Sequence, residues 1–178
     1  ILIQSYLNEL SDLRRVSGSN RESVVSEAFK DLLKGYAKSH DLIFLPQYEL
    51  PKQDGARRIV DGALVYDLRV PFGYWEAKDE EDDLDAEIAK KLRRGYPRDN
   101  IIFEDSRCAV LMQHGNEVMR CQVDDTDKLQ RLLELFFEYE RPEVADFREA
   151  VATVAHVQRG EGGVVELLEV LPVELLEE

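Results

Sequence analysis

The residues best suited to catalysis lie in one short segment, residues 74–78 (YWEAK). In a β-strand successive side chains point to opposite faces, so Glu76 and Lys78 share a face. Asp61 lies in the preceding strand candidate, and antiparallel pairing through the turn near Pro71 would place it beside Glu76. Two carboxylates on adjacent strands form an oxygen site of the kind that binds Mg²⁺ together with a substrate phosphate. Lys78 would then orient a water molecule, as hydrolysis of a phosphodiester requires.

The same spacing also has a simpler explanation. An acid followed by a [DE]-x-K triplet arises easily in a chain in which 34% of the residues are charged. In that case Glu76 and Lys78 form an ordinary surface pair on a half-exposed strand. Two observations favour a functional role: the triplet occurs once in the sequence, and its neighbours are aromatic and apolar, where a charged pair needs a reason. Spacing alone leaves both explanations open.

The elements that must position these residues follow from the periodicity of the apolar side chains. Helical spacing predicts helices over 3–16, from Ser19 to Lys38, over 84–96, after a Thr126 cap, and from Pro142. Apolar and aromatic runs predict strands over 42–49, 59–66, 73–78, 100–104, 107–113 and 117–123. Pro46 indicates an edge or bulged strand, and the first three strands are expected to form an antiparallel meander. We therefore expect an α/β fold with a central mixed sheet flanked by helices.

The charge of the chain is distributed unevenly. The 178 residues carry a net charge of −14, yet residues 79–87 alone hold seven acids and no base. A basic cluster follows this run, at Lys90, Lys91, Arg93, Arg94 and Arg98. The basic cluster fits either a nucleic-acid surface or a solvated helix face, so the net charge does not exclude nucleic acid as a partner. The acidic run fits a solvated loop, a mobile flank, a docking surface or a second cation site.

Length and composition indicate one domain with an appendage. A chain of this size buries a sizeable core, and we expect a domain over residues 1–158. Residues 159–178 are expected to form an acidic linker or docking helix, with further domains beyond it. No apolar run is long enough to span a bilayer and no signal peptide is evident, so we expect a cytoplasmic protein. Cys108 and Cys121 lack metal-ligand spacing and are expected to be buried thiols.

These residues resemble the signature of the PD-(D/E)XK nucleases, the restriction-endonuclease-like superfamily. The signature comprises Asp61 in residues 59–62 (IVDG), residues 76–78 (EAK), and Glu22 on the helix after Ser19. A longer run is more specific, and it comprises residues 73–79 (GYWEAKD), 85–87 (DAE), Lys91, 95–101 (GYPRDNI) and 103–106 (FEDS). This run resembles the N-terminal nuclease domain of type ISP single-chain restriction–modification enzymes. The resemblance extends over roughly residues 5–150.

The resemblance implies a Mg²⁺-dependent DNA endonuclease domain of a bacterial restriction–modification system, in which Mn²⁺ can replace Mg²⁺. It assigns the site to Asp61 and Glu76 as metal ligands, the backbone carbonyl of Ala77 as a third ligand, and Lys78 as the catalytic lysine. Glu22 would add an acid from the helix. Glu27 is the alternative, because Glu22 also fits a capping box with Ser19. Val60 stands where the proline that names the motif is expected.

The resemblance also implies partners for the chain. The basic cluster would hold DNA by its phosphates, and helicase-like and methyltransferase domains of the same polypeptide or complex would choose the target. Two other functions stay open. A catalytically idle docking module would bind a basic partner through its acidic loop and tail, and would tolerate alanine at Asp61 or Glu76. A nuclease of the same superfamily could instead act on RNA or in DNA repair.

Overall fold

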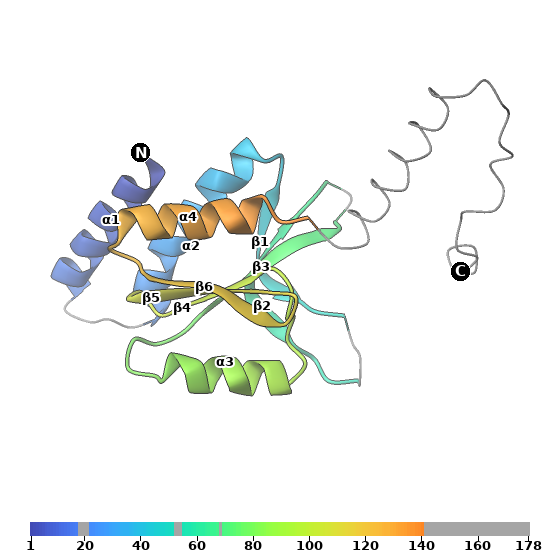
Figure 1. Cartoon of the computed structure of the whole chain (residues 1–178). Helices are drawn as coiled ribbons and strands as arrows, with labels where there is room; N and C mark the ends of the chain where they lie inside the picture. Colours follow the sequence, from blue (N-terminus) through green and yellow to red (C-terminus); the bar gives the residue numbers. More distant parts are fainter. Residues whose placement is uncertain (18–21, 52–54, 68, 141–178) are drawn as a thin grey trace, which may run out of the picture. The chain divides into compact units, whose positions relative to one another are not determined.

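A computed structural model describes residues 1–17, 22–51, 55–67 and 69–140 of the chain (Figure 1). Residues Ile1–Tyr139 form one compact unit. The second unit, Glu140–Glu178, lies outside the described residues except for Glu140. The predicted helix from Pro142, the predicted boundary at residue 158 and the acidic tail also lie outside them and stay predictions. No helix in the described ranges is long and apolar enough to cross a membrane.

The helices and strands of the described residues follow the predicted order. Their bounds are α1 (Leu2–Ser17), α2 (Glu22–Ser39), β1 (Ile43–Glu49), β2 (Ile59–Val65), β3 (Pro71–Ala77), α3 (Leu84–Arg93), β4 (Ile101–Glu104), β5 (Cys108–Gln113), β6 (Asn116–Gln122) and α4 (Thr126–Phe137). Every element predicted within these ranges is therefore confirmed. The ends differ from the predicted ones by at most three residues.

All six strands form one sheet in the order β1-β2-β3-β4-β5-β6. Neighbouring strands are antiparallel except β3 and β4, which are parallel. A parallel pair requires a crossover connection, and α3 lies in the connection between these two strands. The predicted meander of β1, β2 and β3 is confirmed, and Pro46 lies on the edge strand β1 as predicted. The sheet is mixed and flanked by helices, as expected for the predicted α/β class.

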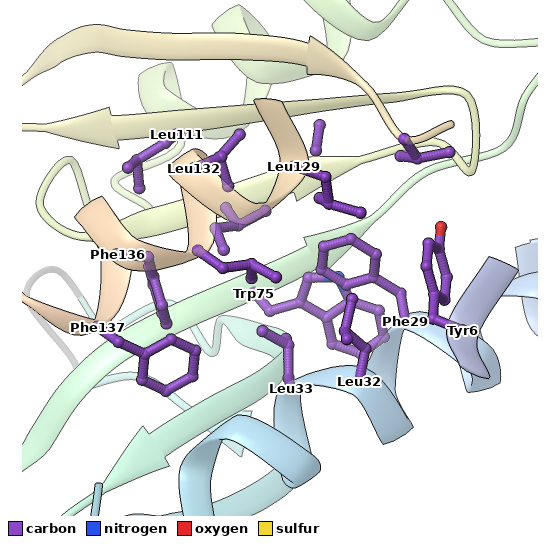
Figure 2. Close-up of a cluster of buried hydrophobic side chains, with 14 of the residues drawn as sticks. Tyr6, Phe29, Leu32, Leu33, Trp75, Leu111, Leu129, Leu132, Phe136 and Phe137 are labelled. Atoms are coloured by element: carbon purple, nitrogen blue, oxygen red, sulfur yellow. The ribbon is translucent and has the colours of Figure 1, made fainter. Parts of the chain in front are cut away.

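Three helices, α1, α2 and α4, cover one face of the sheet, while α3 lies on the other (Figure 1). The three-helix face holds the larger apolar core, in which aromatic rings from α1, α2 and β3 meet (Figure 2). Trp75 of β3 stacks on Phe29 of α2 with 6.2 Å between ring centroids. Tyr6 of α1 meets the same Phe29 ring edge to face. Trp75 is therefore a core residue.

The α3 face holds a smaller core. It is built from Leu84 and Ile88 of α3, Ile101 and Phe103 of β4, and Cys108, Val110 and Met112 of β5. Helix α3 begins after Asp83, whose side chain accepts hydrogen bonds from the N–H groups of Asp85 and Ala86. Cys108 on this face and Cys121 on the other are both free and buried, so the prediction of buried thiols is confirmed.

The end of α3 and the N-cap of α4 differ from the sequence prediction. Helix α3 ends at Arg93 rather than at residue 96, because Gly95 has a φ of +80°, which glycine adopts without strain. Helix α4 begins at Thr126, but its N-cap is Asp125, whose carboxylate accepts a hydrogen bond from the N–H of Lys128. The predicted Thr126 cap is wrong, because an acid one residue earlier satisfies the first turn.

Candidate active site

One row of three polar side chains crosses strands β1, β2 and β3. Because Gly62 pairs with Trp75, the next residues along the two strands, Asp61 and Glu76, lie opposite each other. By the register between β1 and β2, Gln47 lies opposite Asp61 on its other side. Residues directly opposite in an antiparallel pair share a face of the sheet. The strand pairing thus brings the two predicted carboxylates together.

Hydrogen bonds hold the two carboxylates against the strand backbone. Asp61 Oδ2 accepts from the N–H of Ala77 at 3.0 Å, and Glu76 Oε2 accepts from the N–H of Asp61 at 3.4 Å. Gln47 Nε2 donates to Asp61 Oδ1 at 3.1 Å. Asp61 is partly buried, whereas Glu76 is only 2% exposed. The acids form an ordered pair with a water-accessible side and a buried side.

Two lysines contact the same oxygen of Glu76. Lys78 Nζ lies 2.9 Å from Glu76 Oε1, and Lys91 Nζ forms an ion pair with that oxygen. Lys78 also donates to the carbonyl oxygen of Ala77 at 2.5 Å. The side chains of Lys78 and Lys91 are 9% and 16% exposed. A buried carboxylate needs such charged partners, and this burial differs from the half-exposed surface pair of the simpler explanation.

Tyr96 holds Lys91 at the carboxylate. Lys91 Nζ donates to the Tyr96 hydroxyl at 3.1 Å and lies 4.4 Å from the centroid of its ring. The Tyr96 hydroxyl donates in turn to the carbonyl oxygen of Ile59, at the start of β2, at 2.7 Å. Burial lowers the pKa of Lys91, but its hydrogen bonds with Glu76 and Tyr96 raise the pKa more, so it ends above the ordinary value. Lys91 is therefore charged at neutral pH.

The core on the opposite face explains why a glycine follows Asp61. A Cβ atom on Gly62 would lie 2.3 Å from Cζ of Phe44 and 3.0 Å from Cε3 of Trp75. These two rings leave no room for a side chain between them. Strand β2 thus presents an acid to one face and a gap for aromatic rings to the other.

Sequence reasoning missed two residues of this cluster, Gln47 and Tyr96. Gln47 has a φ of +49°, which is uncommon for a residue other than glycine and marks a local distortion of β1. The proline before it signalled an irregular edge strand, and the strand register would have placed it opposite Asp61. Tyr96 lies beyond the end of α3, so only the folded chain reveals that it reaches β2 and Lys91.

The predicted DNA-binding residues fall into two groups. Lys91 contacts Glu76, and Lys90 pairs with Glu87 at 2.6 Å. The other three members, Arg93, Arg94 and Arg98, are exposed. The structure thus keeps three arginines at the surface, at and beyond the end of α3, and brings one lysine into contact with Glu76. Their assignment to DNA stays a prediction.

The helix acid is the site residue that the structure does not connect to the others. Glu22 is the first residue of α2, and its side chain lies outside the described part of the chain. Glu27 is exposed and pairs with Lys30, one turn along the helix. No described contact links Glu27 to Asp61 or Glu76. The role of either acid stays a prediction.

The acidic run over residues 79–87 is largely tied into the fold. At least four of its acids have partners: Glu80 pairs with Arg14 and Arg107, Asp83 caps α3, Asp85 pairs with Arg120, and Glu87 pairs with Lys90. No group of three or more His, Cys, Asp or Glu side chains suited to a metal ion occurs among the described residues. The contacts therefore favour a structural role over a second cation site.

The strand cluster contains the donor types that Mg²⁺ prefers. Mg²⁺ is commonly held by one or two carboxylates, with water and substrate phosphate completing its shell. Asp61 and Glu76 supply two carboxylates, and the Ala77 carbonyl lies in the same hydrogen-bonded cluster. All three are hard oxygen donors, which suits Mg²⁺ or Mn²⁺ better than a softer metal.

Comparison with solved structures finds a likeness to part of a much longer protein. In the cryo-EM structure of a DrdV–DNA complex, one chain matches with a TM-score of 0.82 and 44% sequence identity. The match covers 89% of this chain and 16% of that chain. No protein-family profile and no curated protein matches the chain. This chain therefore corresponds in fold to about one sixth of a protein that was captured on DNA.

The likeness and the observed topology together confirm the predicted fold class, a restriction-endonuclease-like α/β core with a mixed sheet flanked by helices. A TM-score of 0.82 with 44% sequence identity means that the two chains share many residues as well as the arrangement of their helices and strands.

Proposed function

We propose that this chain is a Mg²⁺-dependent DNA endonuclease domain. The observation that carries the proposal is the pair of opposed carboxylates, the partly buried Asp61 and the buried Glu76, with Lys78 in contact with Glu76 Oε1. Such a pair supplies hard oxygen ligands and a cation at one point, which hydrolysis of a phosphodiester needs. The likeness to a protein in complex with DNA supports DNA as the substrate.

The residues of the cluster have separate roles in this proposal. Mg²⁺, held by Asp61, Glu76 and the Ala77 carbonyl, would lower the pKa of water and offset the phosphate charge. Lys78 would orient the attacking water and stabilise negative charge as it develops on the phosphate. The water oxygen forms a bond to phosphorus, one P–O ester bond breaks, and the leaving oxygen takes up a proton. Lys91 would position Glu76.

Target choice would lie outside this domain. Contacts to phosphates position DNA without reading its sequence. The exposed basic residues of this domain would make contacts of this type. We place the domain in a bacterial restriction–modification enzyme of the type ISP kind. Helicase-like and methyltransferase domains in the same polypeptide or complex would then select the site.

Cleavage of supercoiled plasmid tests the proposal. The chain is incubated with Mg²⁺ or Mn²⁺, and Asp61→Ala and Lys78→Ala are compared with Glu81→Gln, an exposed acid of the loop before α3. We expect nicking by the wild type and by Glu81→Gln, no nicking by the two site variants, and none in EDTA. Nicking that persists in both site variants would overturn the site.

The same assay identifies the substrate. Duplex DNA, single-stranded DNA and RNA of equal length are offered side by side. Preferential cleavage of duplex DNA is expected, whereas cleavage confined to RNA would assign the site to a different substrate. Duplex binding without cleavage under any metal condition would contradict catalysis by this chain alone.

A further inference from the structure

A basic pocket adjoins the strand cluster at the carboxyl end of α3. The pocket has a volume of about 520 Å³ and is lined by Ala56, Arg57, Arg58, Ile59, Arg94 and Tyr96. Three of its six lining residues are arginines, contributed by two segments that lie far apart in the sequence. One segment leads into β2 and the other follows α3.

Arg58 is held in place by the end of α3. Its Nε donates a hydrogen bond to the carbonyl oxygen of Arg94, an acceptor that the helix leaves open at its carboxyl end. A Cβ on Gly95 would lie 3.2 Å from Nε and Nη2 of Arg58, so the glycine leaves room for the guanidinium. The positive charge also complements the helix dipole at this end. Arg58 thus forms a fixed wall of the pocket.

The other two arginines of the pocket lie at the protein surface. Arg57 is exposed and its Nε lies 3.1 Å from Glu49 Oε2, in a pair whose side chains are 69% and 43% exposed. Arg94 is exposed as well. A solvent-exposed ion pair contributes little and exchanges readily for another anion. Arg57 and Arg94 are therefore both accessible to an anionic ligand.

Tyr96 connects this pocket to the acidic pair. It lines the pocket, its hydroxyl donates to Ile59 on the same wall, and it receives a hydrogen bond from Lys91, which pairs with Glu76. The pocket and the proposed catalytic cluster thus share one tyrosine as a common wall. If a nucleic-acid strand places one phosphate at Asp61 and Glu76, a neighbouring phosphate of the same strand would lie near the arginines of the pocket.

We infer that the pocket lined by Arg57, Arg58 and Arg94 binds a backbone phosphate of the nucleic acid, beside the phosphate at the catalytic cluster. The inference rests on the proposed function for the identity of the neighbouring site. Guanidinium groups bind phosphate oxygens through paired hydrogen bonds, and an arginine fixed by a helix end is already ordered for that contact. Arg57 and Arg58 lie outside the predicted DNA-binding cluster of residues 90–98, so the pocket adds two arginines to the proposed DNA-binding surface.

Binding of duplex DNA, measured by fluorescence anisotropy in EDTA, tests the inference without any cleavage. The variant is Arg57→Gln combined with Arg94→Gln, because both side chains are exposed and their loss should leave the fold intact. Arg131→Gln on α4, at the opposite face of the sheet, is a control that removes one positive charge away from the pocket. Circular dichroism and thermal melting confirm that all three chains are equally folded.

We expect the double variant to bind duplex roughly tenfold more weakly at about 0.1 M salt, with the slope of log Kd against log salt reduced by about 1 for one lost phosphate contact. The control should match the wild type in both measurements.

Three results would overturn the inference. They are an unchanged Kd and salt slope in the double variant, an equal loss in Arg131→Gln, and no duplex binding by the wild type. Tight binding of inorganic phosphate alone at matched ionic strength, lost in the double variant, would reassign the pocket to a free anion. Failure of the proposed function looks different: the wild type would bind duplex through the arginines and cut nothing.

Discussion

The two faces of the sheet differ in what covers them and in what they leave exposed. Helices α1, α2 and α4 pack one face with aromatic and aliphatic side chains. On the other face, the core beneath α3 is formed mainly with β4 and β5, and the row of Gln47, Asp61 and Glu76 crosses β1 to β3. Trp75 and Glu76 are both 2% exposed, yet they point to opposite faces of the same strand.

This difference shows how one strand combines stability with chemistry. The face that holds Trp75 stabilises the fold by removing apolar surface from water. The face that holds Glu76 buries charge, which is costly unless neighbouring lysines compensate for it. Substitutions on the two faces of β3 should therefore affect different properties, either the free energy of unfolding or the activity.

The largest effect is expected for Glu76→Gln, which keeps the shape of the side chain and removes its charge. We expect the cleavage rate to fall by roughly 10³-fold, as for loss of a group that stabilises a transition state. Thermal melting with and without Mn²⁺ provides an independent measurement: stabilisation by Mn²⁺ should appear in the wild type and vanish in the variant. Equal stabilisation of both proteins would contradict metal binding at Glu76.

The next largest effect is expected for Trp75→Ala, on the opposite face of the same strand. The loss of a buried aromatic ring should lower the free energy of unfolding by about 3–5 kcal/mol. Urea denaturation measures this change. A loss below about 1 kcal/mol would show that the ring contributes little to the core, contrary to its stacking on Phe29.

Gly62→Ala tests the boundary between the faces. The new Cβ would meet the rings of Phe44 and Trp75, and overpacking of this kind should cost about 1–3 kcal/mol. Unfolding in urea measures this cost. Gly115→Ala in the β5–β6 turn provides a contrast: the new Cβ there meets no atom within 4 Å, but the residue has a φ of +76°, which strains alanine. If the variant at Gly62 is as stable as the wild type, the rings must move apart readily.

A smaller effect is expected for Lys91→Met, which removes one of the two cations at Glu76 Oε1. Lys78 keeps its contact with the same oxygen, so single-turnover cleavage should slow by roughly tenfold rather than stop, in line with the loss of one charged hydrogen bond. Lys90→Met is the matched control on the same helix. If Lys91→Met abolishes cleavage as completely as Lys78→Ala, Lys91 takes part in the chemistry directly.

The smallest effect concerns Cys121, on the three-helix side. Burial raises the pKa of this thiol from 9.0 to about 11. The thiol of the unfolded chain releases its proton at a lower pH than the thiol of the folded chain. The contribution of Cys121 to the free energy of unfolding is therefore complete below pH 9 and declines as the pH rises towards 11. Alkylation of Cys121, followed by mass spectrometry, should be slow at pH 8 and should accelerate when urea unfolds the chain.

The strand cluster shows how far sequence reasoning extends. Alternation along residues 74–78 and one antiparallel pairing were enough to place Asp61, Glu76 and Lys78 together. The same reasoning treated Lys91 as part of a basic surface, because helical spacing gives a residue's face but not its depth. Its contact with Glu76 depends on where α3 packs after the crossover.

The helix ends show the same limit on a smaller scale. The sequence predicted that α4 begins near Thr126, and it does, but either Asp125 or Thr126 can serve as a cap by residue type. The folded backbone decides between them. Likewise, Gly95 was visible in the sequence, but its φ and its contact with Arg58 depend on the approach of a segment about 37 residues away.

The amino-acid sequence by itself determined the local features of this protein: the order of helices and strands, the meander, the faces of β3 and the pairing of two acids with one lysine. These follow from periods of two and 3.6 residues and from short turns, which act between neighbours in the chain. Tertiary structure alone decided the second lysine at Glu76, the bridge made by Tyr96 and the arginine pocket. Each of these joins segments far apart in the sequence, and their meeting depends on how the α3 crossover packs on the sheet.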